Sequence, residues 1–264
     1  MTDTTVEEID LPEPTQRKLR LDWILPVFLR PARALREIAA ADTPTWLAPI
    51  LLLSVLALVF TLVAGPLRIQ AALSQPPQLP TDFQNWSPDA QQKFMEANTP
   101  NTGRLMMYGL PGLGALASVW VGWFLLGAVL HLALTFSGGR GSRSADFNLA
   151  AWASLPFAVR WIVQIAAMLA TNQLVAYPGL SGFFPQGAPG LTTYLAGMAA
   201  LFDLYLVWQF ILLVVGASAS SGITRAKALG AVLASLVILL VLEALPGFLL
   251  SQLSGLSVQR PFFF

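Results

Sequence analysis

Two long apolar segments, residues 194–216 and 228–250, stand on either side of a short polar hinge at residues 217–227. Each segment is at least as long as the roughly 20-residue helix that crosses the hydrocarbon core of a bilayer. A surface helix of a water-soluble protein pairs an apolar stripe with a polar face, but these segments are apolar around nearly their whole circumference. They therefore predict two transmembrane helices joined by a tight turn.

Composition extends this prediction to the whole chain. Hydrophobic residues make up 55% of the sequence, charged residues make up 11%, and the mean hydropathy is +0.64. These values are typical of integral membrane proteins. A net charge of +1 with no basic cluster argues against a nucleic-acid partner, since neutralising phosphates needs grouped lysines and arginines. The chain has no cysteine, which excludes disulfides, thiol catalysis and cysteine zinc sites.

The same criteria predict an all-α, polytopic membrane domain over residues 44–250. Its five transmembrane helices are expected at residues 45–67, 111–136, 147–171, 194–216 and 228–250. The turns at 137–146 and 217–227 are basic, as is the stretch before the first span, and basic residues favour the cytoplasmic side. We therefore expect a cytoplasmic N-terminus and a C-terminus outside. No apolar signal peptide precedes the first span, so the N-terminus is expected to stay inside.

The segments at the two ends of the chain differ from the membrane domain. Residues 1–19 are too polar to bury a core and are expected to form a disordered cytoplasmic tail, and residues 251–264 a short outer tail. Residues 20–43 mix apolar and basic side chains, which predicts an amphipathic helix lying in the lipid headgroup region. Its expected lipid contacts are Trp23, Arg30, Arg33 and Arg36. The alternative is a helix packed beneath the bundle.

Prolines and glycines mark where the helices are expected to end or bend. The Gly65–Pro66 pair closes the first predicted span, and Pro111 marks the bend or true start of the second. Pro156 interrupts the third span. The connection at residues 68–104 is expected outside the membrane, with a short helix that starts at Pro88 and no metal-binding or catalytic spacing.

Three charged residues fall within the predicted spans at a similar depth. At about 1.5 Å of rise per residue, Arg160, Asp203 and Glu243 lie roughly 10 to 17 Å from the outer boundary. A charge at that depth costs several kcal/mol unless it is paired, so we predict an Arg160–Asp203 ion pair, with Glu243 nearby or neutral. Gln164 is expected on the same face as Arg160. This polar layer is either a structural pair that fixes which helices meet or a relay for protons or ions.

A set of residues spread along the chain resembles the YIP family, the Ypt-interacting proteins. The set comprises Pro31, Pro156, the DLYLVW stretch with Asp203, Tyr205 and Trp208, then Gly216, and the TRAKAL hinge with Lys227. The resemblance covers about residues 20 to 250. It implies five spans and a cytoplasmic N-terminus, and in eukaryotes a role in vesicle trafficking through small GTPases. The resemblance to bacterial members, many of which accompany transport systems, implies a location in a bacterial inner membrane.

Enzyme chemistry has few candidate residues. His131 is the only histidine, so metal sites that need several histidines are excluded. Ser218, in the GASA stretch, lacks the final glycine of the GxSG motif of intramembrane serine proteases. We therefore expect no catalytic residues, no metal and no cofactor.

The sequence as a whole predicts a non-enzymatic scaffold or accessory protein of the YIP type. Its expected partners are membrane lipids, another membrane protein or transporter, and a second copy of the chain. The alternative is a small permease, or a subunit of an ABC-type export system, that uses the Arg160 and Asp203 layer.

Overall fold

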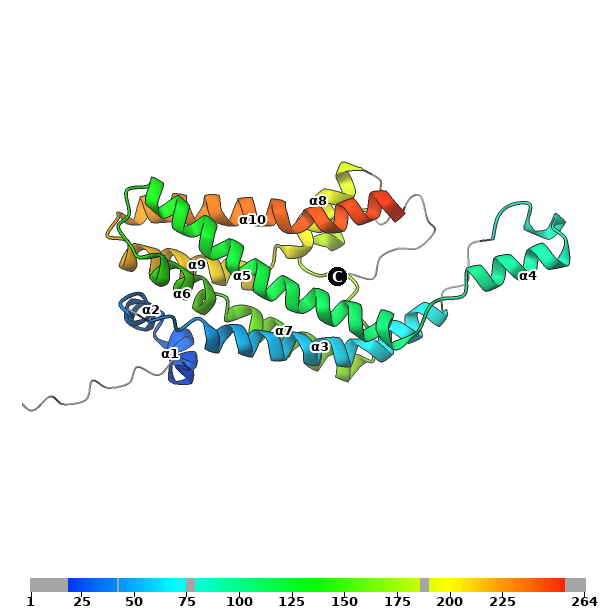
Figure 1. The fold of residues 1–264 in the computed structure, drawn as a ribbon, viewed down its shortest axis with the longest axis horizontal. Coiled ribbons are helices and arrows are strands. Elements are labelled where there is room, and N and C mark those ends of the chain that lie inside the picture. The colour runs from blue at the N-terminus through cyan, green and yellow to red at the C-terminus, as the bar shows by residue number, and fades with distance from the viewer. Residues whose placement is uncertain (1–18, 42, 75–78, 186–189, 255–264) are drawn as a thin grey trace, which may run out of the picture.

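The computed structural model describes residues 19–41, 43–74, 79–185 and 190–254, and these residues form helices and connecting loops without a β-strand (Figure 1). The predicted tails at 1–19 and 251–264 lie mostly outside the described residues. The main helices are α1 (Ile24–Leu29), α2 (Pro31–Ala39), α3 (Leu47–Ser74), α4 (Pro88–Ala97), α5 (Leu110–Phe136), α6 (Arg143–Ala153), α7 (Pro156–Thr171), α8 (Leu191–Leu201), α9 (Leu204–Ser220) and α10 (Arg225–Ser254).

The membrane-spanning character of the fold is confirmed. Four helical segments are long and apolar enough to cross a bilayer, namely Leu47–Ser74, Leu105–Phe136, Arg143–Thr171 and Arg225–Leu249. Helices α8 and α9 form a fifth span if they count as one, but they are bent by 65° at the break between them. The fold is therefore an all-α, multi-span membrane protein with four or five spans.

The helices form one elongated bundle. Helix α5 packs against α3, α6 and α10, while α9 packs against α2, α6, α7 and α10. Every residue from Ala145 to Ala153 is buried, so α6 lies at the centre of the packing, whereas no residue of α8 is buried. The bundle is therefore densely packed around α6 and looser around α8.

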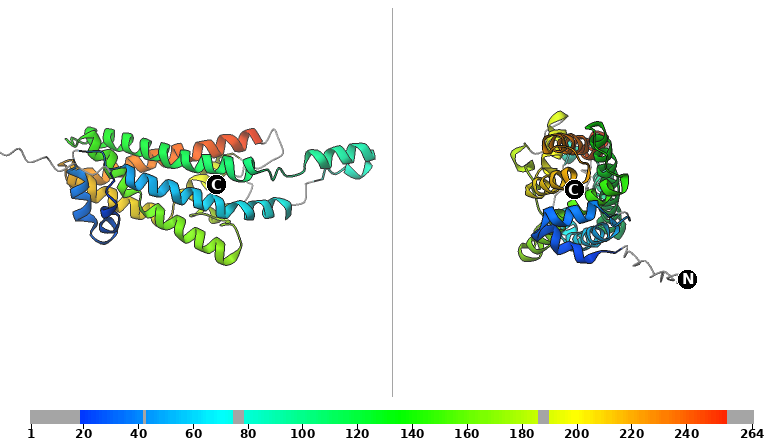
Figure 2. Two further views of the ribbon diagram at one scale, coloured as in Figure 1. Left: turned by 60° about the horizontal axis from the view of Figure 1, so that its bottom comes forward. Right: turned by 90° about the vertical axis from the view of Figure 1, so that its left-hand side faces the viewer.

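The two ends of the bundle carry different structures (Figures 1 and 2). Helices α1 and α2 lie at the same end as the α5–α6 and α9–α10 loops, and α4 projects from the opposite end. The two loops are joined by a hydrogen bond of 3.1 Å from the Arg140 backbone N–H to the Ser221 carbonyl. We call this end the basic end. Its exposed cations are Arg30, Arg33, Arg36, Arg140, Arg143, Arg225 and Lys227.

The first long helix does not end where the sequence predicted. Helix α3 continues through Pro66 to Ser74 instead of closing at Gly65–Pro66. A Cβ at Gly65 would overlap the Tyr108 ring, so this glycine permits close packing and does not terminate the helix. Tyr108 belongs to a short π-helix, Leu105–Gly109, that leads into α5.

Three other local predictions, at Pro111, Pro88 and Pro156, can be compared with the structure. At Pro111 the helix neither bends sharply nor truly begins, because the π-helix Leu105–Gly109 runs directly into α5 and the segment that could span the membrane is Leu105–Phe136. Helix α4 starts at Pro88, and the Ser87 hydroxyl accepts a hydrogen bond from the Ala90 N–H. Pro156 is the first residue of α7, and a turn at Ser154 and Leu155 separates α7 from α6.

The fourth predicted span is broken. The sequence predicted one helix over residues 194–216, but the chain is extended at Asp203, with φ −141° and ψ −179°. The Asp203 carboxylate accepts a hydrogen bond of 2.9 Å from the Leu206 N–H and so caps the start of α9. A capping side chain within an apolar run is the reason why α8 and α9 are separate.

The segment before α3 packs onto the bundle, which is the alternative considered from its sequence. The expected lipid contact of Trp23 is wrong, because Trp23 is only 6% exposed and packs edge-on against Trp152 at 5.7 Å. Leu35 and Ile38 on α2 are fully buried, so this helix packs onto the bundle. The arginines of α2 remain exposed.

Candidate functional site: a polar cavity between the helices

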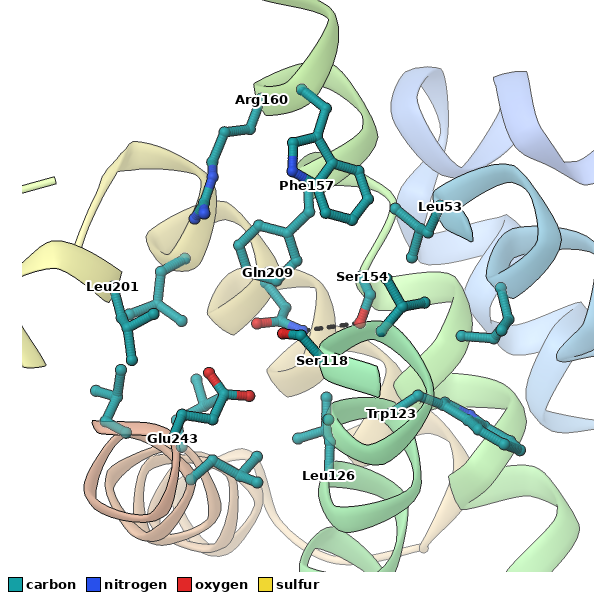
Figure 3. Close-up of a pocket in the computed structure, with 18 residues that line it drawn as sticks. Leu53, Ser118, Trp123, Leu126, Ser154, Phe157, Arg160, Leu201, Gln209 and Glu243 are labelled. Carbon is teal, nitrogen blue, oxygen red and sulfur yellow. Dashed lines mark hydrogen bonds between the residues drawn. The ribbon is translucent and has the colours of Figure 1, made fainter. Parts of the chain in front are cut away.

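A cavity of about 140 Å³ lies between α3, α5, α7, α9 and α10 (Figure 3). Its walls are mainly leucine, isoleucine and aromatic side chains. The polar side chains that line it are Ser118, Ser154, Arg160, Gln209 and Glu243. A buried apolar pocket with a few polar groups is the usual form of a ligand site in a helical bundle.

The predicted partners Arg160 and Asp203 lie together at the edge of this cavity. One guanidinium nitrogen, Nη1, donates a hydrogen bond of 3.2 Å to the Asp203 Oδ2, and their side chains are 22% and 16% exposed. Because the other Asp203 oxygen accepts from the Leu206 N–H, the carboxylate binds α7 and caps α9 at the same time. The pair therefore holds α7 to the break between α8 and α9.

The contact with Asp203 uses only some of the hydrogen-bond donors of the Arg160 guanidinium. Its guanidinium lies over the Phe157 ring at 5.4 Å, a distance that suits a cation–π contact. The Nε–H is buried and has no hydrogen-bond partner among the described residues. Arg160 thus keeps one free donor next to the cavity.

A second polar contact crosses the cavity wall. The Gln209 amide nitrogen donates a hydrogen bond of 2.9 Å to the Ser154 hydroxyl, and both residues are buried (Figure 3). The sequence showed Gln209 only as a polar residue in an apolar run and did not single out Ser154. The missed signal is that Ser154 stands two residues before Pro156, where a helix break is expected.

Glu243 enters the cavity from α10. Figure 3 shows its carboxylate and the Arg160 guanidinium on facing walls, both directed into the open space. The carboxylate lies beside Gly122, where a Cβ would be 3.2 Å from Oε1. Gln164 is half-buried on α7 and does not line the cavity. The structure therefore gathers three of the four residues expected in the polar layer.

The remaining family-like residues lie at helix starts and helix contacts. Pro31 and Pro156 occupy the first turns of α2 and α7. Trp208 packs against the Phe28 ring at 5.4 Å, and Tyr205 beside it is half-buried. Trp208 thus joins α9 to α1, whereas the two prolines mark helix starts.

The last two of these residues lie toward the basic end. A Cβ at Gly216 would overlap the Leu149 side chain, so the glycine lets α9 approach α6 closely. Lys227 is exposed in the first turn of α10, and its backbone N–H reaches the Thr224 hydroxyl at 3.5 Å. Gly216 therefore belongs to the α6–α9 contact, and Lys227 lies at the start of α10.

A polar pair that the sequence did not predict joins α5 to α6. The His131 Nδ1 lies 2.7 Å from the Asp146 Oδ2, and the Asp146 side chain is buried.

The Ser218 hydroxyl donates to the Val215 carbonyl at 3.0 Å. This partner gives no support to the serine-protease interpretation, in which His131 would activate Ser218.

Comparison with known proteins gives one match. The family model described as the Yip1 domain matches residues 25–245 of the chain. The match runs from α1 into α10 and includes the cavity. No curated protein and no solved structure matches the chain.

Proposed function

Because the chain belongs to the Yip1 domain family of membrane proteins, we propose that it acts as a non-enzymatic membrane scaffold or accessory protein. In this role it organises a region of membrane, or supports trafficking or a transport complex, by binding another membrane protein. The bundle supplies the rigid frame that such a role needs. We place it in a bacterial inner membrane with the N-terminus in the cytoplasm and the C-terminus outside.

The observation that carries this proposal is the use of both Asp203 oxygens. One oxygen accepts from the Leu206 N–H and the other from Arg160. A proton or ion relay needs groups that can exchange partners, whereas these contacts hold the α8–α9 break in place. The arrangement supports a structural role for the pair.

The basic end supplies the proposed contact with lipid. Leu21, Leu25 and Leu29 are 63%, 64% and 69% exposed, and we call them the leucine row. Leu25 and Leu29 are one turn apart on α1, and Leu21 lies in the short 3-10 helix, Leu21–Trp23, that precedes it. Exposed leucines beside the arginines of α2 suit a position in the headgroup region, with the leucines in the acyl boundary and the guanidinium groups at phosphates. In place of Trp23, the leucine row provides the apolar contact.

The proposal is tested by capturing the protein from its own membrane. We expect tagged protein, crosslinked before detergent extraction, to retain a membrane protein or a transporter in a fixed ratio. The variant Asp203→Ala, which loosens the frame, should retain less of it, whereas the exposed-site control Glu96→Ala should not. Recovery of lipid alone with both proteins would contradict the scaffold role.

The cavity favours a second candidate function, a small permease or a subunit of an ABC-type exporter. It places a carboxylate and a guanidinium inside an otherwise apolar bundle. Purified protein that moves solute across liposomes would identify a permease, and a copurifying ATPase would identify an exporter subunit. If neither is found, this second candidate fails and the scaffold proposal is unaffected.

A further inference from the structure

The charges around the cavity do not balance. Arg160 is paired with Asp203, which leaves the Glu243 carboxylate as the remaining charged group on the wall. Among the described residues, none donates a hydrogen bond to this carboxylate. A carboxylate within an apolar bundle is costly unless it has a partner or takes up a proton. A ligand with one positive charge would supply that partner.

The aromatic and leucine side chains of the cavity wall indicate which class of ligand fits beside Glu243. Trp123 and Trp161 line the cavity, and aromatic faces together with a carboxylate are the usual surroundings of a bound ammonium group. The other walls near Glu243 are leucines on α10, namely Leu236, Leu239 and Leu240. They suit an alkyl chain attached to that ammonium group.

The site also has room and access. Gly122 faces the Glu243 carboxylate without a side chain, and much of the Glu243 surface is not covered by other residues. A volume of about 140 Å³ admits a small ammonium headgroup and the start of its chain. A ligand can therefore reach the carboxylate without opening the packed region around α6.

We propose that this cavity binds an alkylammonium group, with the positive charge at Glu243 and the apolar chain along α10. The ammonium group comes from one of two sources, an aminophospholipid headgroup that enters from the bilayer or a free amphipathic amine. This inference goes beyond the scaffold role, because a scaffold needs no ligand. The ligand would make the bundle responsive to the amines of its membrane.

Thermal unfolding in maltoside detergent tests the proposal with octylamine as the probe. The amine is charged at neutral pH, whereas octanol has the same chain without charge and octanoate carries the opposite charge. Ligand that binds only the folded state raises the Tm with saturation. We expect a saturable rise with octylamine alone, and we expect Glu243→Gln to weaken its apparent affinity at least tenfold. The control Glu96→Gln, on exposed α4, should bind like the wild type.

Two glycine variants on α5 keep the test decisive if Glu243→Gln folds poorly. Gly122→Val keeps the carboxylate but fills the space in front of it, and should abolish binding. Gly114→Val makes the same change where a Cβ meets no atom within 4 Å, and should leave binding unchanged. The proposal is overturned if octylamine acts no differently from octanol, if octanoate binds better, or if Gly122→Val binds like the wild type.

Nanodiscs distinguish the two sources of the ammonium group. We expect octylamine to bind in phosphatidylglycerol discs, where the lipid carries no ammonium group. If phosphatidylethanolamine then weakens octylamine binding severalfold, the lipid headgroup occupies the site. If it does not, the natural ligand is a free amine.

Discussion

The Asp203 carboxylate makes two separable contacts, and replacing it by alanine or by asparagine tests them one at a time. Alanine removes both the cap on α9 and the partner of Arg160. Asparagine removes the charge but can still accept from the Leu206 N–H, since asparagine is a good N-cap residue. The difference in unfolding free energy between the two variants therefore measures the contribution of the cap on α9.

The size of the ion-pair effect follows from the distance. At 3.2 Å, the Arg160–Asp203 attraction is about 5 kcal/mol for an effective dielectric constant of about 20. Desolvation of both groups offsets part of this, so we expect a net coupling of about 2 kcal/mol, or about 30-fold in the folded-to-unfolded ratio. Loss of a helix cap adds about 1 kcal/mol.

A double-mutant cycle gives the expected pattern. We expect destabilisation of about 2 kcal/mol for Arg160→Ala, about 2 kcal/mol for Asp203→Asn and about 3 kcal/mol for Asp203→Ala. The double variant Arg160→Ala/Asp203→Ala should lose only about 3 kcal/mol, because the pair is lost once. Reversible unfolding in mixed micelles with increasing SDS provides the measurement.

Two outcomes of the cycle would contradict these expected losses. If the double variant loses the sum of the two single losses to within about 0.5 kcal/mol, Arg160 and Asp203 do not interact energetically. If Asp203→Asn loses as much as Asp203→Ala, the side chain does not act as a cap.

Three further predictions concern packing, lipid contact and topology. Gly216→Val should destabilise the bundle by about 1–3 kcal/mol in the same unfolding assay, because the new side chain meets Leu149. Gly230→Val, where the new side chain lies in open space, should cost less than about 0.5 kcal/mol. A fluorophore on Leu25→Cys should be quenched by brominated lipids more strongly than one on Arg33→Cys. Equal quenching would contradict insertion of the leucine row. These labels are specific because the chain has no native cysteine. Arg140→Cys and Arg225→Cys should both react with an impermeant thiol reagent from the cytoplasmic side of the membrane. The two loops lie on the same side because the Arg140 and Ser221 backbones are hydrogen-bonded. Labelling from opposite sides would refute this topology.

Features set by neighbouring residues could be predicted from the sequence. The start of α4 at Pro88 and the start of α7 at Pro156 follow from the geometry of proline, which suits the first turn of a helix. The meeting of Arg160 and Asp203 followed from their similar depth, because few partners exist for a charge in lipid.

Features set by contacts between distant residues could not be predicted. Helix α3 passes through Pro66 while Tyr108, more than 40 residues later, packs against Gly65. The pairing of His131 with Asp146 depends on how α5 and α6 are rotated, which the apolar pattern leaves undetermined because both helices are largely apolar. Trp23 was assigned to lipid for a similar reason, since its partner Trp152 belongs to a distant helix.

The uneven packing of the bundle has a consequence for its local opening. Amide exchange in detergent should be slowest in α6, whose residues from Ala145 to Ala153 are all buried, and much faster in α8, which buries none. Leu201, at the end of α8, forms part of the cavity wall. Brief unwinding of α8 would open the cavity on this side while the rest of the protein stays folded. The rate at which α8 unwinds therefore sets the upper limit on how fast a ligand can enter the cavity past α8.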